Sequence, residues 1–262
     1  MDGFWQTPGK IPPLRDDAVQ IWRVELVGAG AASEDSRLLL ESSAHLLSPE
    51  ERSQAARMRV GGPLEEFTVG RGCLRLLLGS ALDRSPASLV LERGLHGKPF
   101  VRAERGTVAP SFNVAHSHGV VLIGLSLLGE IGVDVEFVDP AIDLEGVAQT
   151  AFHPDEVSRV LAASTLADRL GVFYRCWTRK EALAKADGRG LTLEPSTYVA
   201  GLDEPGEQRV TFPDMMAGDE FVVRELEVGP LHRAALAMRG GTWPVRTYQF
   251  LGSLGLFMQS NH

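Results

Sequence analysis

Two acidic residues separated by a single position form the first pair whose types and spacing suggest chemistry. Asp134 and Glu136 lie in an otherwise mostly apolar run at 131–137. Alternate residues of a strand point to the same side, so both carboxylates would share one face of this strand. Mg²⁺ takes oxygen ligands and commonly binds one or two carboxylates together with substrate phosphates. The solvent-facing half of an amphipathic strand explains the same spacing, and the pair by itself favours that alternative.

A second group lies on one face of a predicted helix. Trp177, Glu181 and Lys185 follow at intervals of four residues, which places them in one stripe and lets Glu181 and Lys185 pair. On a solvated surface this pair would contribute only about 0.2–0.5 kcal/mol. If the helix packs beside the strand that carries Asp134, Glu181 becomes a third oxygen ligand and Lys185 a cation for a phosphate oxygen. Spacing alone leaves both interpretations open.

Histidine and basic residues supply further candidates. His116 follows the stretch 112–115, and His118 comes two positions later. His116 near a sharp turn would contact a phosphate or stabilise a leaving group, although a structural hydrogen-bonding role is more common. A zinc site is disfavoured because no Cys or third His stands at ligand spacing.

Two basic motifs suit an anionic ligand. Gly97-Lys98-Pro99 holds a cation in a stiff turn, where Gly97 permits close backbone approach. Arg71 and Arg75 are four residues apart on one helix face, which suits an anion or, more commonly, a solvated surface.

The elements that must position these residues alternate between helices and strands. Ser48-Pro49-Glu50-Glu51 has an N-cap, a proline at the first helical position and a glutamate three residues after the cap, so it starts a helix. The pattern predicts helices at 48–57, 64–82 and 165–188, and strands at 19–27, 88–92, 111–115, 120–126, 131–137, 197–201, 208–212, 221–228, 233–238 and 245–251. The three strands at 111–137 are expected to pair antiparallel. Both halves then combine helices with an antiparallel sheet, so the predicted class is α+β.

Composition limits the possible functions. The chain has 262 residues, 44% of them hydrophobic, with 26 Lys and Arg against 34 Asp and Glu and a formal net charge of −8. This charge disfavours a protein that coats nucleic acid. The two cysteines, Cys73 and Cys176, are far apart, which excludes a disulfide framework and favours a reducing compartment. Residues 1–15 contain no apolar segment of a signal peptide or membrane helix, so we expect a cytoplasmic protein.

The predicted domain organisation has four parts. Residues 1–17, rich in Gly, Pro and charge, are expected to be a flexible leader. An N-terminal α+β half follows at 18–128 and a C-terminal α+β half at 129–250, and residues 251–262 form a tail.

The order of the motifs is more specific than any one of them. Gly97-Lys98-Pro99, then 112–117 (FNVAHS), 131–136 (IGVDVE) and 177–185 (WTRKEALAK), resembles the Sfp-type phosphopantetheinyl transferase family over residues 45–240. The resemblance implies two similar α+β halves related by a pseudo-twofold axis, with coenzyme A and Mg²⁺ bound between them in a self-contained monomer. It also implies transfer of the phosphopantetheine arm of coenzyme A to a serine of an apo acyl or peptidyl carrier protein, leaving adenosine 3′,5′-bisphosphate.

Site roles follow from the same resemblance. Metal ligands would be Asp134, Glu136 and Glu181, with Glu181, Lys185 and His116 as the catalytic residues. The coenzyme A contacts would be Lys185 at the pyrophosphate, His116 at a phosphate, Gly97, Lys98 and Pro99 at the adenine nucleotide, and Arg71 on the side of the 3′-phosphate.

Departures from the family pattern leave other functions open. Ala115 stands where the family usually has serine, and Glu51 and Gln54 stand where lysines are often found, which leaves Arg57, Arg71 and Arg75 as substitute cations. A degenerate relative that binds coenzyme A or carrier domains without chemistry is one alternative, and a Mg²⁺-dependent phosphohydrolase of unrelated fold is another. The complete set of acidic residues with Lys185 argues against the first, and the motif order argues against the second. No feature of the sequence identifies the pathway whose carrier proteins are served.

Overall fold

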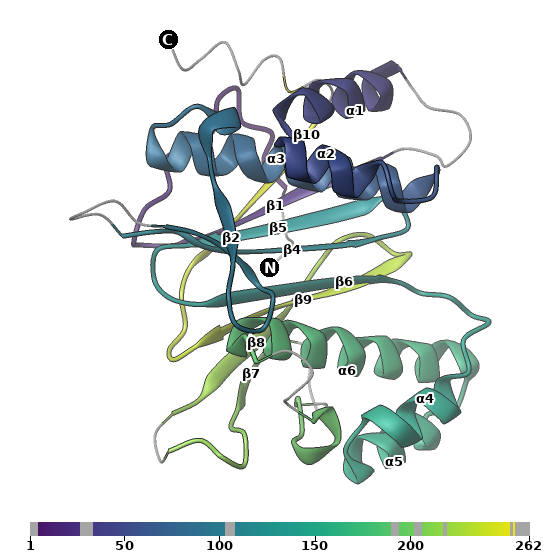
Figure 1. The fold of residues 1–262 in the computed structure, drawn as a ribbon. Coiled ribbons are helices and arrows are strands. Elements are labelled where there is room, and N and C mark those ends of the chain that lie inside the picture. Colours follow the sequence, from purple (N-terminus) through teal and green to yellow (C-terminus); the bar gives the residue numbers. More distant parts are fainter. Residues whose placement is uncertain are drawn as a thin grey trace. The chain divides into compact units, whose positions relative to one another are not determined.

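Two compact units make up the chain, one from Gly3–Leu128 with Pro244–His262 and the other from Gly129–Trp243. The computed structural model describes residues 5–26, 34–102, 108–189, 194–201, 206–216, 219–251 and 254. Each unit contains a four-stranded sheet and a long helix (Figure 1). The α+β class predicted from the sequence is therefore confirmed.

The sheet of the first unit is assembled from both ends of the chain. Its strand order is β10-β1-β5-β4, where β1 pairs parallel with β10 and antiparallel with β5. Trp22 of β1 is fully buried and stacks with Tyr248 and Phe250 of β10, with ring centroids 4.8 and 4.7 Å apart. The strand bounds are β1 Val19–Glu25, β4 Ser111–Ser117, β5 Val120–Ser126 and β10 Val245–Phe250.

Helix α3 covers this sheet because its glycines allow close approach on two sides. A Cβ at Gly70 would lie 3.2 Å from the Val121 side chain, and one at Gly72 would lie 2.6 Å from the Ser43 backbone of α1. Glycines that weaken a solitary helix thus bring α3 against both its neighbours. The remaining elements are α1 Glu34–Leu46, α2 Pro49–Ala55, α3 Gly62–Leu82, the 3₁₀ turn η1 Pro86–Ser88, and the hairpin strands β2 Leu91–Arg93 and β3 Pro99–Val101.

The second unit has an antiparallel sheet in the order β6-β9-β8-β7. The predicted long helix is present as α6, which begins after the Thr165 cap and ends at Gly188 in the left-handed conformation. The elements of the second unit are β6 Ile131–Phe137, α4 Leu144–Ala151, α5 Pro154–Ala162, α6 Leu166–Asp187, the 3₁₀ turn η3 Pro195–Thr197, β7 Glu207–Val210, β8 Phe221–Leu226 and β9 His232–Arg239. Across the described ranges, no helix is long and apolar enough to span a membrane.

Strand β10 corrects the predicted domain boundary at 250. The strand forms where expected, but it pairs with β1 from Val19↔Val245 to Val24↔Phe250 and so belongs to the first unit. Leu254, in the predicted tail, is buried in the core of that unit. The other residues of the tail, except Leu251, lie outside the described residues.

The segment at 1–17 was predicted to be a flexible leader, but its described part, residues 5–17, contacts the rest of the first unit. The Gln6 amide donates to the Thr247 carbonyl at 3.0 Å, and the Gln20 side chain donates to the Pro13 carbonyl at 3.0 Å. Ile11 and Leu14 pack against the core. Backbone pairing and apolar contacts therefore hold this segment.

Two predicted strands, at 197–201 and 88–92, are wrong over all or part of their length, because side chains rather than a neighbouring strand bond to their backbone groups. At 197–201, Tyr198 and Ala200 alternate as buried residues, but the Tyr198 carbonyl accepts from Lys180 and the Ala200 amide donates to Glu156. At 88–92 the strand starts only at Leu91, since the Leu89 carbonyl accepts from Arg75.

Pairing of the three central strands is correct only in part. β4 and β5 pair antiparallel, whereas β6 pairs with β9 in the other sheet. The alternation of a strand identifies its faces but not its partner. Helices α1 and α4 were not predicted.

Candidate functional site

Gly132 brings helix α6 against strand β6 and creates the geometry of the first candidate site. A Cβ built on Gly132 would lie 2.1 Å from the Ala182 carbonyl oxygen and 2.4 Å from the Ala186 amide nitrogen of α6. Gly132 and Asp134 are on the same face of β6, because side chains alternate along a strand. Helix α6 thus covers the face of β6 that carries the Asp134 carboxylate. Asp134 therefore does not face solvent, and the alternative of a solvent-facing half of an amphipathic strand is wrong for this residue.

Asp134 meets Lys185 directly. The Lys185 Nζ donates to Asp134 Oδ1 at 2.6 Å, and Asp134 is only 3% exposed. Burial raises the pKa of Asp134 above its usual value, although Lys185 works in the opposite direction. Asp134 Oδ2 is buried and accepts no hydrogen bond from the described residues. One carboxylate oxygen is thus occupied by the lysine, and the other is an acceptor that a further cation would satisfy.

Glu181 lies within electrostatic range of the same pair. Burial raises the pKa of Glu181, Lys185 lowers it, and the negative charge of Asp134 raises it further. The negative charges of buried Asp134 and half-buried Glu181 are therefore offset by one positive charge, that of Lys185. An arrangement of this kind, with oxygen donors and excess negative charge, fits a hard divalent cation.

Glu136 is less closely associated with this group. It shares a strand face with Asp134, and its charge acts on Tyr174, which lies seven residues before Glu181 on α6. Among the described residues, no three His, Cys, Asp or Glu side chains are close enough to hold a metal ion. The structure thus brings together Asp134, Lys185 and Glu181, and it does not gather all three predicted metal ligands.

A buried ion pair fixes the register of α6 behind this site. Lys180 Nζ lies 2.7 Å from Glu156 Oε2 of α5 and donates to the carbonyls of Pro195 and Tyr198 at 2.6 and 2.7 Å. Both side chains are almost completely buried. Because all three donors of Lys180 have a partner, α6 is tied to α5 and to the segment at 195–200.

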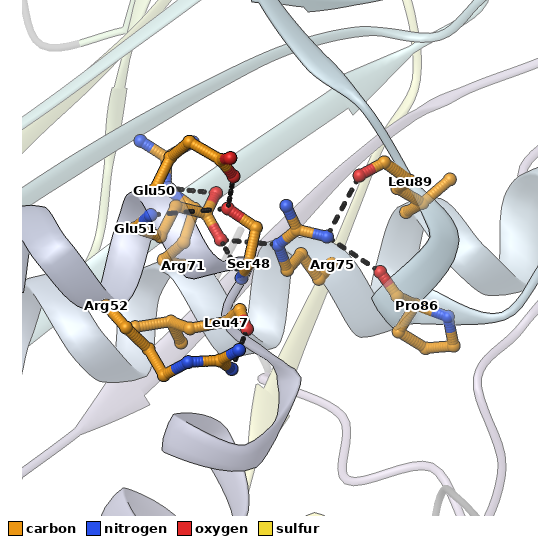
Figure 2. A network of polar contacts seen from close by, with 9 residues as sticks. All are labelled: Leu47, Ser48, Glu50, Glu51, Arg52, Arg71, Arg75, Pro86 and Leu89. Atoms are coloured by element: carbon orange, nitrogen blue, oxygen red, sulfur yellow. Dashed lines mark hydrogen bonds and ion pairs between the residues drawn. The ribbon is translucent and has the colours of Figure 1, made fainter.

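The first unit carries a cationic cavity of about 390 Å³. Figure 2 shows part of its lining, where Glu51 of α2 contacts two arginines of α3. The Arg75 Nε donates to Glu51 Oε2 at 2.6 Å, and the Arg71 Nε lies 3.5 Å from Glu51 Oε1. Glu51 also accepts from the Ser48 amide in the predicted capping box. The cap of α2 and the arginines of α3 thus share one carboxylate.

Arg71 and Arg75 have different environments within this cavity. Arg75 is 1% exposed and also donates to the carbonyls of Pro86 and Leu89, so it links structural elements. Arg71 is more accessible. Burial lowers the pKa of Arg71, Glu51 raises it, and the positive charges of Arg75 and Arg93 lower it further. Three arginines line the cavity with two glutamates, Glu50 and Glu51, and the excess positive charge favours the binding of an anion.

The predicted cationic turn forms the edge of the same region. Gly97 adopts a φ of +83° in the turn of the β2–β3 hairpin, and its amide donates to Gly94. Pro99 lines the cavity together with Gln54 and Arg93, whereas Lys98 is half-buried in the turn beside them. Arg57, proposed as a substitute cation, is exposed and is not among the cavity-lining residues.

His116 lies in a second cavity of the first unit, with a volume of about 510 Å³. Its Nδ1 is 2.8 Å from Glu66 Oε2 of α3, and Ser117 and His118 line the cavity beside it. Ala115, in contrast, is buried in β4. Ser117 is therefore the serine available near His116.

Several residues of these sites were missed at the sequence level. Glu66 and Arg93 received no role, and Glu51 was predicted to cap the helix at 48–57 and noted as a departure from lysine, but was not linked to the arginines. Glu51 had a detectable signal, since it is the third residue after the cap in Ser48-Pro49-Glu50-Glu51. Nothing local links Glu66 to His116, because the two are 50 positions apart.

Comparison with known proteins adds independent information. Residues 130–235 match the model of the 4′-phosphopantetheinyl transferase superfamily. The 4′-phosphopantetheinyl transferase HetI of Nostoc sp. is 32% identical over 238 residues, covering 90% of this chain and 94% of HetI. A phosphopantetheinyl transferase of Thraustochytrium sp. is 31% identical over 242 residues, covering 83% and 80% of the two chains. Sfp of Bacillus subtilis is 24% identical over 198 residues, covering 76% and 84%.

Proposed function

The chain belongs to the 4′-phosphopantetheinyl transferase superfamily, and we therefore propose that it transfers the phosphopantetheine arm of coenzyme A to a serine of an apo carrier protein. The observation that carries the proposal is the contact between Lys185 and Asp134 beside Glu181. It lies within the span that matches the family model. A cation next to buried, incompletely compensated carboxylates suits phosphate chemistry.

Mg²⁺ is the proposed cofactor, with Asp134 and Glu181 as ligands and Glu136 as the third. The uncompensated Asp134 Oδ2 and the raised pKa of Glu181 support the first two. Glu136 is included because it shares the strand face of Asp134. When bound, the ion neutralises charge on the pyrophosphate oxygens.

The first unit supplies the proposed contacts for coenzyme A. Arg71 in the cationic cavity suits the 3′-phosphate, with Gly97, Lys98 and Pro99 at the adenine nucleotide. His116 suits another phosphate of coenzyme A, and Lys185 of the second unit suits the pyrophosphate. Arg71, Lys98, His116 and Lys185 each offer a cationic or N–H donor group to a phosphate oxygen, and Gly97 and Pro99 shape the turn that carries Lys98.

The chemistry needs positioning and charge neutralisation more than covalent participation. The serine oxygen attacks the β-phosphorus of coenzyme A, the new O–P bond forms, and the bond to the bridging oxygen breaks. Adenosine 3′,5′-bisphosphate leaves with that oxygen, and the serine proton passes to solvent. Lys185 and His116 offset the negative charge that develops on the phosphate oxygens.

Intact-mass spectrometry of an apo carrier domain tests this function. With the enzyme, coenzyme A and Mg²⁺, we expect a mass gain of one phosphopantetheine arm, and no gain with the Asp134→Ala variant or with a chelator in place of Mg²⁺. An exposed substitution, Glu145→Gln on α4, serves as the matched control and should retain transfer. Binding of coenzyme A without any mass gain on carriers of several pathways would instead indicate a non-catalytic relative.

Metal binding is tested separately from turnover. Addition of Mg²⁺ should raise the Tm of the wild-type protein, because a ligand of the native state stabilises it by RT ln(1 + [L]/Kd), or about 1.4 kcal/mol at ten times Kd. The Asp134→Ala variant should show no such rise. An equal rise in both proteins would remove Asp134 from the ligand set.

We also propose that the protein acts as a cytoplasmic monomer. One chain supplies both the carboxylate group and the cationic cavities, so no second copy is required. Light scattering at assay concentrations should give the mass of a single chain, and a dimer mass would contradict this.

A further inference from the structure

Glu66 is a buried carboxylate that has no counterpart in the motifs. Its side chain is 7% exposed, and one of its oxygens has a partner on β4 while the other has a partner in the turn that joins β4 to β5. Oε2 lies 2.8 Å from Nδ1 of His116, and Oε1 accepts from the Gly119 amide at 2.6 Å. One side chain of α3 thus holds both the His116 ring and the turn that follows it.

The turn is itself constrained to present this amide. His118 and Gly119 have φ values of +44° and +83°, and a Cβ at Gly119 would lie 2.9 Å from the Leu26 carbonyl oxygen. Although burial raises the pKa of Glu66, the hydrogen bonds from His116 and Gly119 lower it, and the net pKa is below the usual value. Glu66 is therefore an ionised, acceptor-only group.

An acceptor-only partner determines which nitrogen of His116 carries a proton. Nδ1 must be the donor to Glu66, whether the ring is neutral or positively charged. Nε2 is then the atom left for a ligand. The His116 side chain is 40% exposed and lines the 510 Å³ cavity, so the ring is accessible to one.

We infer that Glu66 is a positioning residue for the transfer reaction: it orients the His116 ring, fixes its proton on Nδ1 and balances the positive charge of the ring when Nε2–H donates to a phosphate oxygen of coenzyme A. This inference rests on the proposed function, which assigns His116 to a phosphate. Both oxygens of Glu66 are engaged by His116 and Gly119, so Glu66 acts through the ring.

A double-mutant cycle tests the coupling. Glu66→Gln should lower kcat/KM for coenzyme A by about tenfold, the effect of losing a hydrogen bond to a charged group. In a His116→Ala background the same substitution should change kcat/KM less than about twofold. Glu41→Gln on α1, whose exposed carboxylate lines neither cavity, is the matched control for loss of charge and should leave kcat/KM within about twofold of wild type. An equal loss in both backgrounds would overturn the inference.

Nuclear magnetic resonance provides a readout that does not depend on activity. In the wild-type protein, the ¹⁵N shifts of His116 should show a protonated Nδ1, with the signal assigned by its disappearance in His116→Ala. In Glu66→Gln the amide NH₂ can donate to Nδ1 while the Gly119 amide still donates to the Gln oxygen, so the neutral ring should shift its proton to Nε2. An unprotonated Nδ1 in the wild-type protein would also overturn the inference. Absence of transfer by wild-type protein would contradict the proposed function instead, and the spectra would still decide the Glu66–His116 interaction.

Discussion

The carboxylates of Asp134 and Glu181 lower the stability of the folded protein, while the proposed chemistry requires them. Burial raises the pKa of both carboxyls, and the charge of Asp134 raises that of Glu181 further. Lys185 compensates only part of this negative charge. An incompletely compensated buried charge costs folding free energy, and such a cost is characteristic of binding and catalytic sites.

We therefore expect Glu181→Gln to raise Tm in the absence of Mg²⁺ while transfer is lost. Because the folded-state pKa lies above the ordinary value of 4.5, ionisation at higher pH destabilises the native state. The Tm gain should be absent well below pH 4.5, where the carboxyl is protonated in both states, and should grow as pH rises through the raised pKa. Thermal melts across pH 4–8 check this, and a lower Tm of the variant at pH 7 would contradict it.

Between elements, the approach of α6 to β6 decides whether the site exists. Gly132 leaves no room for a side chain between the strand and the helix, and this closeness allows Lys185 to reach Asp134. On the opposite side of this contact, Lys180 and Glu156 fix the helix against α5. The position of the site thus depends on a close backbone contact and a buried ion pair that carry no chemistry themselves.

Gly132→Ala should destabilise the protein and reduce transfer together. Overpacking of a close contact costs about 1–3 kcal/mol, and any shift of α6 separates Lys185 from Asp134. Gly171→Ala is the matched control on α6, because a Cβ there meets nothing within 4 Å; it should stabilise the protein by up to about 1 kcal/mol. Urea unfolding and the mass assay measure both effects, and a neutral Gly132→Ala would refute the close contact.

Lys180→Met should be strongly destabilising. Removing one member of a buried ion pair costs about 3–5 kcal/mol, because the remaining charge is left uncompensated. The double variant Lys180→Met, Glu156→Gln should recover part of this loss in urea unfolding. If the double variant is as unstable as the sum of the two single variants, then the pair is not coupled.

On the scale of the whole molecule, the first unit needs both ends of the chain. β10 supplies the parallel neighbour of β1 and two of the rings around Trp22, while the second unit is a continuous segment. Loss of the C-terminal strand should therefore affect the two units unequally.

Truncation after Trp243 should selectively remove protection in the first unit. In hydrogen exchange, we expect the amides of β1 to lose protection, since the sheet loses an entire strand and Trp22 becomes exposed. The amides of β6 and β9 should retain most of theirs. Equal loss in both units would mean that they unfold as one cooperative body.

Local sequence signals were sufficient to predict several of the helices and strands and the type of chemistry. Periodicity, the cap at Ser48 and the Gly188 end gave the helices at 49–55, 62–82 and 166–187 to within a few residues, because these signals act within one turn of chain. The order of motifs identified the family, since side-chain type and spacing are properties of the sequence alone.

Which residues come into contact depends on the packing of the folded units. Glu66 and His116 are 50 positions apart, and Arg23 and Gln249 on the paired strands β1 and β10 are 226 apart. At 197–201 the alternation suggested a strand, but Lys180 and Glu156 take the backbone hydrogen bonds there. Alternation and spacing describe which way a side chain faces relative to its own element, whereas the partner is chosen by packing of the whole unit.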